Sequence, residues 1–175
     1  KIKDGYIIAS AKKGLKGCAI KFPKISVGAT ENILIAACFA KGETKLRNCA
    51  IEPEINDLIY FLKKLGCKIK RIGKRSINVL GVKELRSTVH KVIFDRIETG
   101  TYIIAAALTK GRLKIKNIDP KIMSTEIRLL HKMGVDIIKK KNYIIASRSK
   151  KLKSINIITK PYPGFPTDLQ AQIMV

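Results

Sequence analysis

An internal repeat constrains the fold of this chain more than any other feature of its sequence. The segment Ala36–Gly42 aligns with Ala105–Gly111, and Leu62–Gly66 aligns with Leu130–Gly134. The offsets of the two alignments differ by one residue, with a period of about 68 residues, and such a period indicates a duplicated supersecondary unit. The repeat predicts an α/β fold made of stacked copies of one unit, and by itself it implies no activity.

Hydrophobic periodicity and turn residues predict the elements of each copy. In the first copy we expect strands over Tyr6–Ser10, Cys18–Phe22, Lys45–Asn48, Lys68–Ile72 and Ser76–Leu80, and helices over Thr30–Lys41 and Ile55–Leu65. Gly42 and Gly66 are expected to end these helices. In the second copy we expect helices over Thr101–Lys110 and Thr125–Met133 and strands over Val135–Ile138 and Tyr143–Ser147, after which Pro161–Val175 begins a third copy. The pentapeptide at Tyr6–Ser10 recurs letter for letter at Tyr143–Ser147.

The charge of the chain is strongly positive. A formal net charge of +23 arises from 36 Lys and Arg residues against 13 Asp and Glu residues. Such a charge can mark a surface for nucleic acid or for an anionic membrane. The basic residues are spread along the whole chain, and the densest run, residues 63–75, lacks the interleaved aromatic residues that stack on bases. We therefore favour a solvated basic surface over specific nucleic-acid binding.

Other features bound the class of protein. Hydrophobic residues make up 46% of the chain, enough for a sizeable core. No apolar stretch approaches the length of a membrane span, and the first residues do not resemble a signal peptide. The absence of an initiator Met and the apolar last residues lead us to expect a piece of a longer protein. Four scattered cysteines favour buried thiols in a cytoplasmic protein over a metal or redox site, and no cofactor is expected; they are Cys18, Cys38, Cys49 and Cys67.

Three helix starts are candidate sites, and the first is Pro23–Thr30. A helix N-terminus carries a partial positive charge and unpaired N–H groups, Gly28 lets a ligand approach the backbone, Ser26 offers a hydroxyl and Lys24 adds a cation. Together they form a plausible cradle for a phosphate or nucleotide. Ser26 can equally be an ordinary N-cap, so both interpretations stay open at this point.

The other two starts differ in their residues. In Pro161–Asp168, three prolines and a glycine predict a stiff loop. Asp168 at its end is either a helix N-cap or a functional carboxylate that takes a proton from a substrate hydroxyl. In Asp95–Thr101, three charged residues within four positions favour a local network of ion pairs and caps.

At this point the sequence resembles a known family. The motifs that carry the resemblance, in order and at matching spacing, are Ser26–Thr30, Glu52–Ile55, Asp95–Thr101 and Phe165–Gln172. Together they resemble the UDP-N-acetylglucosamine 1-carboxyvinyltransferase family of enolpyruvyl transferases. The resemblance implies two similar domains, each an inside-out α/β barrel of three βαβαββ units around inward helices. It also implies a boundary at Asp95–Arg96, with residues 1–94 as the last repeat of one domain and residues 95–175 as the first repeat of the other plus the start of its next.

The resemblance implies a reaction as well. Enolpyruvate is transferred from phosphoenolpyruvate to the 3-hydroxyl of UDP-N-acetylglucosamine, with release of phosphate, in the first committed step of peptidoglycan synthesis. The positions that match the UDP-holding segment are Lys24, Ile25, Ser26, Val27 and Gly28. Asp168 matches the aspartate that binds the sugar and accepts the hydroxyl proton.

The sequence also departs from the family pattern. The reactive cysteine and the arginines that bind phosphoenolpyruvate lie in segments absent from this sequence, and none of the four cysteines matches the reactive one. Tyr162 stands where many members carry His. We expect part of the UDP-sugar site, no complete phosphoenolpyruvate site and no activity from this chain alone. The alternatives are the shikimate-pathway enolpyruvyl transferase and a non-catalytic basic module that binds nucleic acid.

Overall fold

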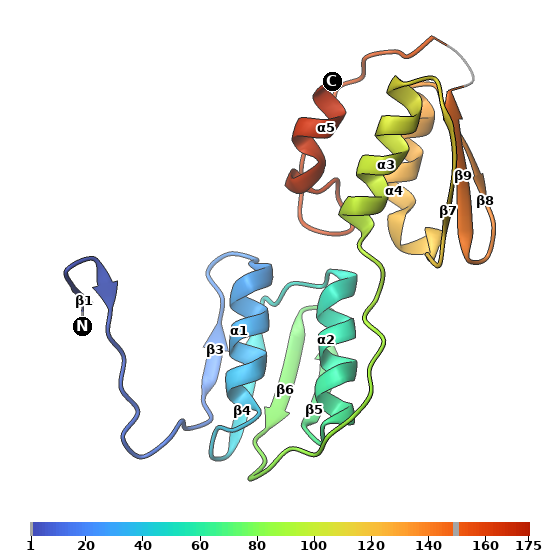
Figure 1. The fold of residues 1–175 in the computed structure, drawn as a ribbon. Coiled ribbons are helices and arrows are strands. Elements are labelled where there is room, and N and C mark those ends of the chain that lie inside the picture. The colour runs from blue at the N-terminus through green and yellow to red at the C-terminus, as the bar shows by residue number, and fades with distance from the viewer. Residues whose placement is uncertain (1, 149–150) are drawn as a thin grey trace. The chain divides into compact units, whose positions relative to one another are not determined.

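The computed structural model describes residues 2–148 and 151–175, which form two compact units (Figure 1). The first unit ends at Lys91, and the second extends from Val92 to Val175. Each is a mixed α/β unit with its own sheet and its own apolar core. The two main sheets are open within the described residues, so the closed barrel implied by the resemblance is not seen in this structure.

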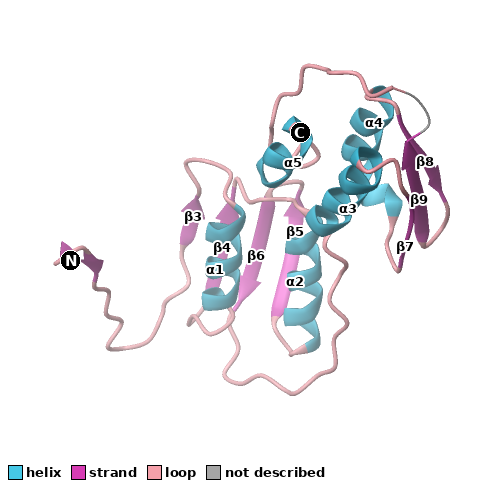
Figure 2. Cartoon of the chain, turned by 45° about the horizontal axis from the view of Figure 1, so that its top comes forward, coloured by secondary structure: helices cyan, strands magenta, loops and turns pink. Residues whose placement is uncertain are grey.

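The first unit follows the order βαβαββ. Its elements are β3 (Ala19–Lys21), α1 (Val27–Ala37), β4 (Glu43–Arg47), α2 (Pro53–Lys64), β5 (Lys68–Gly73) and β6 (Ser76–Leu80). The strands lie in the order β3-β4-β6-β5, with β3 parallel to β4 and with β6 antiparallel to both β4 and β5. Both helices cover the same face of this sheet (Figure 2).

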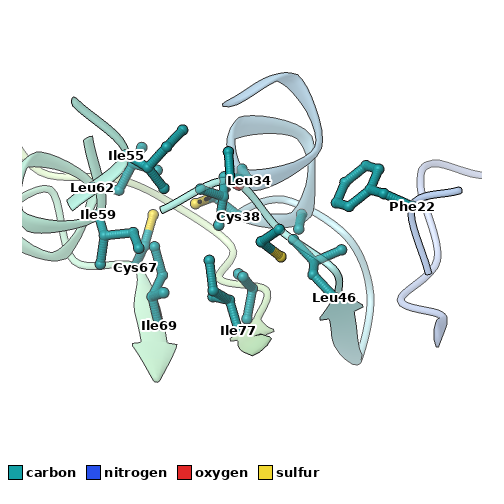
Figure 3. Packing of buried hydrophobic residues seen from close by; sticks show 14 residues of the cluster. Phe22, Leu34, Cys38, Leu46, Ile55, Ile59, Leu62, Cys67, Ile69 and Ile77 are labelled. Atoms are coloured by element: carbon teal, nitrogen blue, oxygen red, sulfur yellow. Dashed lines mark hydrogen bonds between the residues drawn. The ribbon is translucent and has the colours of Figure 1, made fainter. Parts of the chain in front are cut away.

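Figure 3 shows the core of the first unit, which lies between these two helices and the sheet. Side chains alternate between the two faces of a strand, so Leu46 and Ile77 are fully buried whereas Lys45 is exposed. Leu34 from α1 and Ile55 from α2 complete the contact and are also fully buried. Burying each such side chain contributes about 1.5–3 kcal/mol before the loss of conformational entropy is subtracted.

The second unit repeats most of this pattern. Its elements are α3 (Arg96–Leu108), β7 (Arg112–Lys116), a 3-10 helix (Pro120–Met123), α4 (Ser124–Lys132), β8 (Val135–Lys139), β9 (Tyr143–Arg148), a second 3-10 helix (Thr167–Leu169) and α5 (Gln170–Met174). The strands lie in the order β7-β9-β8, and both pairings are antiparallel. The described residues of this unit contain no strand that corresponds to β3.

Backbone geometry confirms the internal repeat. Asn48 after β4 and Asn117 after β7 both adopt the left-handed conformation, with φ of 59° and 61°. Gly66 after α2 and Gly134 after α4 do the same, with φ of 107° and 98°. Four left-handed residues at corresponding positions are not expected from unrelated folds, because side chains other than glycine rarely adopt this conformation.

Two helices differ from the expectation in where they begin or end. Helix α1 begins at Val27 and ends at Ala37, so Gly42 is not its cap. The helix ends in tight turns in which the N–H groups of residues 38–40 donate to carbonyls three residues earlier, and Gly42, at φ +90°, turns the chain into β4. Helix α3 begins at Arg96 rather than Thr101, because the carboxylate of Asp95 caps it.

The expected strand Tyr6–Ser10 is largely wrong. Only Tyr6–Ile7 forms a strand, β2, which pairs with the two-residue strand β1 (Ile2–Lys3). Ile7 is 83% exposed, whereas Ile144, its counterpart in the identical pentapeptide, is fully buried. Helix α3 packs on β9, whereas all four residues of the β1–β2 pair are exposed. The same five letters therefore end up in different environments, because the neighbouring elements differ.

The described residues contain no helix that is both long enough and apolar enough to cross a membrane.

The cysteines Cys38, Cys49 and Cys67 are buried free thiols, as expected, whereas Cys18 is exposed. Burial, aided by a hydrogen bond with Cys67, raises the pKa of the Cys38 thiol to about 12. Burial also raises the pKa of Cys49. These two thiols therefore stay protonated and are poor nucleophiles.

Candidate functional site

The segment Lys24–Gly28 leads from β3 into α1 and is held by its neighbours in the first unit. Phe22, just before it, is buried, and its N–H donates to the carbonyl oxygen of Arg47 at 3.1 Å. The carbonyl of Phe22 accepts a hydrogen bond from the side-chain amide of Asn48 at 2.9 Å. The left-handed conformation of Asn48 turns that amide back toward the segment. The backbone entering the helix is therefore fixed from two sides.

Apolar and polar residues alternate along this segment. Ile25 and Val27 pack against the apolar core of the first unit. Lys24, Ser26 and Gly28 are exposed. The two apolar side chains anchor the segment, and the three residues expected to meet a ligand face solvent.

The start of α1 keeps hydrogen-bond donors available. Ser26 is the N-cap: its hydroxyl accepts the N–H of Ala29 at 3.2 Å, and its carbonyl accepts both the N–H and the hydroxyl of Thr30. The capping interpretation of Ser26 is thus confirmed. Within the described residues, the N–H groups of Val27 and Gly28 have no partner. Together with the helix dipole they suit an anionic group.

The corresponding start of α3 is different. Asp95 accepts the N–H groups of Ile97 and Glu98 at 2.7 and 3.0 Å, and Glu98 adds a second negative charge in the first turn. Helix α1 has no acidic residue in its first turn. Of these two repeat-related helix starts, only that of α1 offers free N–H groups without a competing carboxylate.

The fold itself does not require a glycine at position 28. A Cβ there would meet nothing within 4 Å, and the residue is not in the left-handed region. Because alanine has the higher helix propensity, Gly28→Ala should raise the free energy of unfolding of the first unit by about 0.5–1 kcal/mol. Urea unfolding followed by NMR, which separates the signals of the two units, measures this change.

Gly66→Ala is the matched control for this prediction. A Cβ at Gly66 also meets nothing, but the φ of +107° strains any other residue, so stability should fall. Reduced stability for Gly28→Ala would show that the fold needs this glycine.

Asp168 follows a loop that is closed by its own hydrogen bonds. The N–H of Lys160 donates to the carbonyl of Phe165, and the N–H of Gly164 donates to the carbonyl of Pro161, both at 2.9 Å. A Cβ at Gly164 would lie 2.5 Å from the Cβ of Lys160, so the loop accepts only glycine there. The bond between Tyr162 and Pro163 is cis.

This loop is also anchored to the helices of the second unit. The hydroxyl of Thr125 on α4 donates to the carbonyl of Pro163 at 2.7 Å. Leu169 is fully buried, and a Cβ at Gly100 on α3 would lie 2.6 Å from its Cδ1. Gly100 therefore provides the notch that accepts Leu169, next to Asp168.

The carboxylate of Asp168 is exposed and is not a helix cap. The 3-10 helix Thr167–Leu169 has Pro166 at its N-cap position, and α5 begins without a side-chain cap. Among the described residues, the carboxylate accepts one hydrogen bond, from the hydroxyl of Thr167 at 3.4 Å. The capping interpretation of Asp168 is therefore wrong. A solvent-accessible carboxylate on an anchored loop is suited to accept a hydrogen bond from a substrate hydroxyl and then its proton.

Asp95 and Arg96, the expected domain crossing, have separate structural tasks. Asp95 caps α3, as described above. Arg96 is buried, and its Nη1 lies 3.0 Å from Oε1 of Glu126 on α4. The ring of Tyr162 lies 5.6 Å from Cζ of Arg96. The expected local network is confirmed for the helix cap at Asp95. It is wrong for the ion pair, because the partner of Arg96 lies thirty positions further along the chain.

Comparison with known sequences decides the family. The sequence profile described as EPSP synthase (3-phosphoshikimate 1-carboxyvinyltransferase) matches residues 1–175. The chain belongs to the EPSP synthase family. Among curated relatives of this family, UDP-N-acetylglucosamine 1-carboxyvinyltransferase of Pelagibacter ubique is 62% identical over 175 residues, which are 100% of this chain and 42% of the relative. The enzyme of the same name from Endomicrobium trichonymphae is 49% identical, over 99% of this chain and 41% of the relative. The chain thus spans less than half the length of these relatives.

Solved structures of an enolpyruvyl transferase and of an EPSP synthase share the fold. The enolpyruvyl transferase NikO from Streptomyces tendae matches with a TM-score of 0.85 at 24% identity, over 99% of this chain and 44% of that chain. EPSP synthase from Acinetobacter baumannii matches with a TM-score of 0.57 at 20% identity, over 91% of this chain and 36% of that chain. These matches establish a mixed α/β fold of the enolpyruvyl transferase type.

Sequence reasoning missed one buried acidic residue of this EPSP synthase family member and gave no role to another. Glu126 is 1% exposed and pairs with Arg96. The sequence offered one signal for Glu126, which is a charged residue at an inward-facing position of an amphipathic helix. Glu52, in the second motif, is 6% exposed, and its carboxylate accepts the N–H of Ile51 at 2.8 Å. Its burial at the start of α2 indicates a structural contribution.

Proposed function

We propose that this chain is part of an enzyme that transfers enolpyruvate from phosphoenolpyruvate to the 3-hydroxyl of UDP-N-acetylglucosamine. The single observation that carries the proposal is the 62% identity, along the whole chain, to the P. ubique enzyme of that name. The curated relatives at 45–62% identity share this name, which favours it over the shikimate-pathway alternative. The open N-terminus of α1 and the exposed carboxylate of Asp168 supply chemistry that such a substrate requires.

The diphosphate of the nucleotide is assigned to Lys24–Gly28. The free N–H groups of Val27 and Gly28 can donate to phosphate oxygens, and the exposed ammonium group of Lys24 offsets their charge. The absence of a side chain on Gly28 lets the ligand approach the backbone. Ile25 contributes to this segment by holding it on the core.

Asp168 is assigned to the sugar. Its carboxylate accepts the proton of the 3-hydroxyl while the hydroxyl oxygen attacks C2 of phosphoenolpyruvate and C3 takes up a proton, which gives a tetrahedral adduct. Loss of phosphate from C2 and of a proton from C3 then re-forms the double bond and gives the enolpyruvyl product. We assign no residue of this chain to phosphoenolpyruvate and no metal or cofactor to the reaction.

The proposal extends to the architecture. Residues 1–94 would form the last βαβαββ unit of one barrel domain, and residues 95–175 the first unit of the other plus the start of its next, with the crossing at Asp95–Arg96. The support is the βαβαββ order of the first unit and the start of a further helix at α5. The three buried free thiols fit a reducing cytoplasm.

A chimera tests the proposed function. Residues 1–175 replace the aligned segment of the P. ubique enzyme, and release of phosphate from phosphoenolpyruvate is measured with UDP-N-acetylglucosamine or shikimate 3-phosphate as acceptor. We expect turnover with the UDP-sugar only. Titration calorimetry adds a binding readout, in which Gly28→Val should weaken UDP-sugar affinity because its branched side chain occupies the ligand's approach, whereas Gly28→Ala should weaken it less.

Two results would contradict the proposal. One is a folded chimera that is inactive with the UDP-sugar or active with shikimate 3-phosphate. The other is a Gly28→Val chimera with unchanged UDP-sugar affinity, which would remove Lys24–Gly28 from the site. Salt-sensitive DNA binding without UDP-sugar binding would favour the basic-module alternative instead.

A further inference from the structure

The repeat shows an unusual pair in the second unit. The helix N-caps and the left-handed glycines align position 96 with position 27 and position 126 with position 58. The first unit has Val27 and Leu58 there, two partly buried apolar side chains that pack against its core. The second unit has Arg96 and Glu126. An apolar pair in one copy is thus a buried ion pair in the other.

Packing of the two helices does not require this ion pair. In the first unit the corresponding helices contact each other with Val27 and Leu58 partly buried against the core. The side chains of Arg96 and Glu126 are 7% and 1% exposed, so both charges have lost most of their water. Replacing such a pair by apolar residues is often neutral or stabilising, because mutual attraction seldom exceeds the cost of desolvation. A gain in folding stability therefore does not explain why the second unit has this ion pair.

Tyr162 supplies that explanation. A guanidinium group can pair with a carboxylate in its plane and stack on an aromatic ring with its face, and the Tyr162 ring lies 5.6 Å from Cζ of Arg96. Two neighbouring residues of α4 hold two neighbouring residues of the loop. Thr125 donates a hydrogen bond directly to the carbonyl of Pro163. Glu126 acts through Arg96, because it orients the guanidinium group that faces Tyr162.

We infer that Arg96, oriented by Glu126, is a positioning residue that fixes Tyr162 and thereby the loop that presents Asp168. The loop then has three anchors: this stack, the hydrogen bond from Thr125, and the notch at Gly100 that receives Leu169. The consequence for catalysis rests on the proposed function, whereas the consequence for loop order does not.

The test is the double variant Arg96→Val/Glu126→Leu, which gives the second unit the two residue types that the first unit has at the corresponding positions. In the 175-residue chain, hydrogen exchange at the amides of Lys160 and Gly164, which close the loop, should accelerate about tenfold or more, while exchange in the middle of α3 stays unchanged. In the P. ubique chimera, kcat should fall by ~10²-fold with little change in the KM for phosphoenolpyruvate, because a misplaced group affects the transition state more than binding.

A second pair of variants leaves the ion pair in place. Tyr162→Leu should reproduce both effects, and Tyr162→Phe, which keeps the ring, should restore wild-type exchange and kcat. Wild-type loop exchange in the double variant and in Tyr162→Leu would overturn the inference. Failure of the double variant to fold would also overturn it, because the pair would then be needed for packing. If the unsubstituted chimera is inactive but the exchange results hold, the proposed function fails and the positioning of the loop stands.

Discussion

Asp168→Asn is expected to lower kcat of the chimera by about 10²–10⁴-fold, the usual contribution of a general base. The amide keeps the shape of the carboxylate but cannot accept the hydroxyl proton. Because the carboxylate of Asp168 is exposed and caps no helix, the substitution should leave the free energy of unfolding nearly unchanged. Initial rates of phosphate release and a thermal melt of the same preparation measure the two quantities.

Asp136→Asn provides the matched control. Asp136 is a partly exposed carboxylate on β8 of the same unit, and the same chemical change there should leave kcat within about twofold. A chimera with Asp168→Asn that retains near-normal turnover would remove Asp168 from the chemistry, and an equal loss in both variants would point to a general effect of charge.

Removing Arg96 alone is expected to destabilise the second unit by about 3–5 kcal/mol. Arg96→Ala removes the guanidinium group that lies 3.0 Å from the carboxylate of Glu126, a side chain that is 1% exposed. The cost comes from the charge that remains, so Arg96→Ala should be far more damaging than the double replacement by Val and Leu. Urea unfolding followed by NMR signals of the second unit gives both values.

Arg112→Ala controls for the loss of one positive charge. Arg112 is exposed on β7 in the same unit, and its removal should change the free energy of unfolding by less than about 0.5 kcal/mol. A cost below about 1 kcal/mol for Arg96→Ala would mean that the buried carboxylate does not depend on this partner.

The features predicted well from the sequence depend on local chemistry or on the repeat. Ser26 can cap a helix with its own hydroxyl, and Gly66 ends a helix because it tolerates a positive φ, so both follow from residues within one turn. The matched positions Asn48 and Asn117 preserve a left-handed turn in both copies. Such features need no knowledge of the tertiary fold.

The errors arise where distant elements decide the outcome. Tyr6–Ser10 and Tyr143–Ser147 have the same letters, but only the second becomes a buried central strand, because α3 covers it. Arg96 has acidic neighbours in sequence, yet it pairs with Glu126 on another helix. For Asp168 the sequence left a helix cap and a functional carboxylate open, and only the 3-10 turn at the end of the loop, which leaves the carboxylate exposed, excludes the cap. Local propensity contains none of this information.

We propose that Lys24–Gly28 and Asp168 bind one UDP-sugar. A crystal structure of the chimera with UDP-N-acetylglucosamine bound is the test. We expect diphosphate oxygens within hydrogen-bond distance of the N–H groups of Val27 and Gly28, and a carboxylate oxygen of Asp168 about 2.6–3.2 Å from the oxygen of the sugar 3-hydroxyl. A nucleotide bound away from the start of α1, or a 3-hydroxyl that has no hydrogen bond to Asp168, would contradict it.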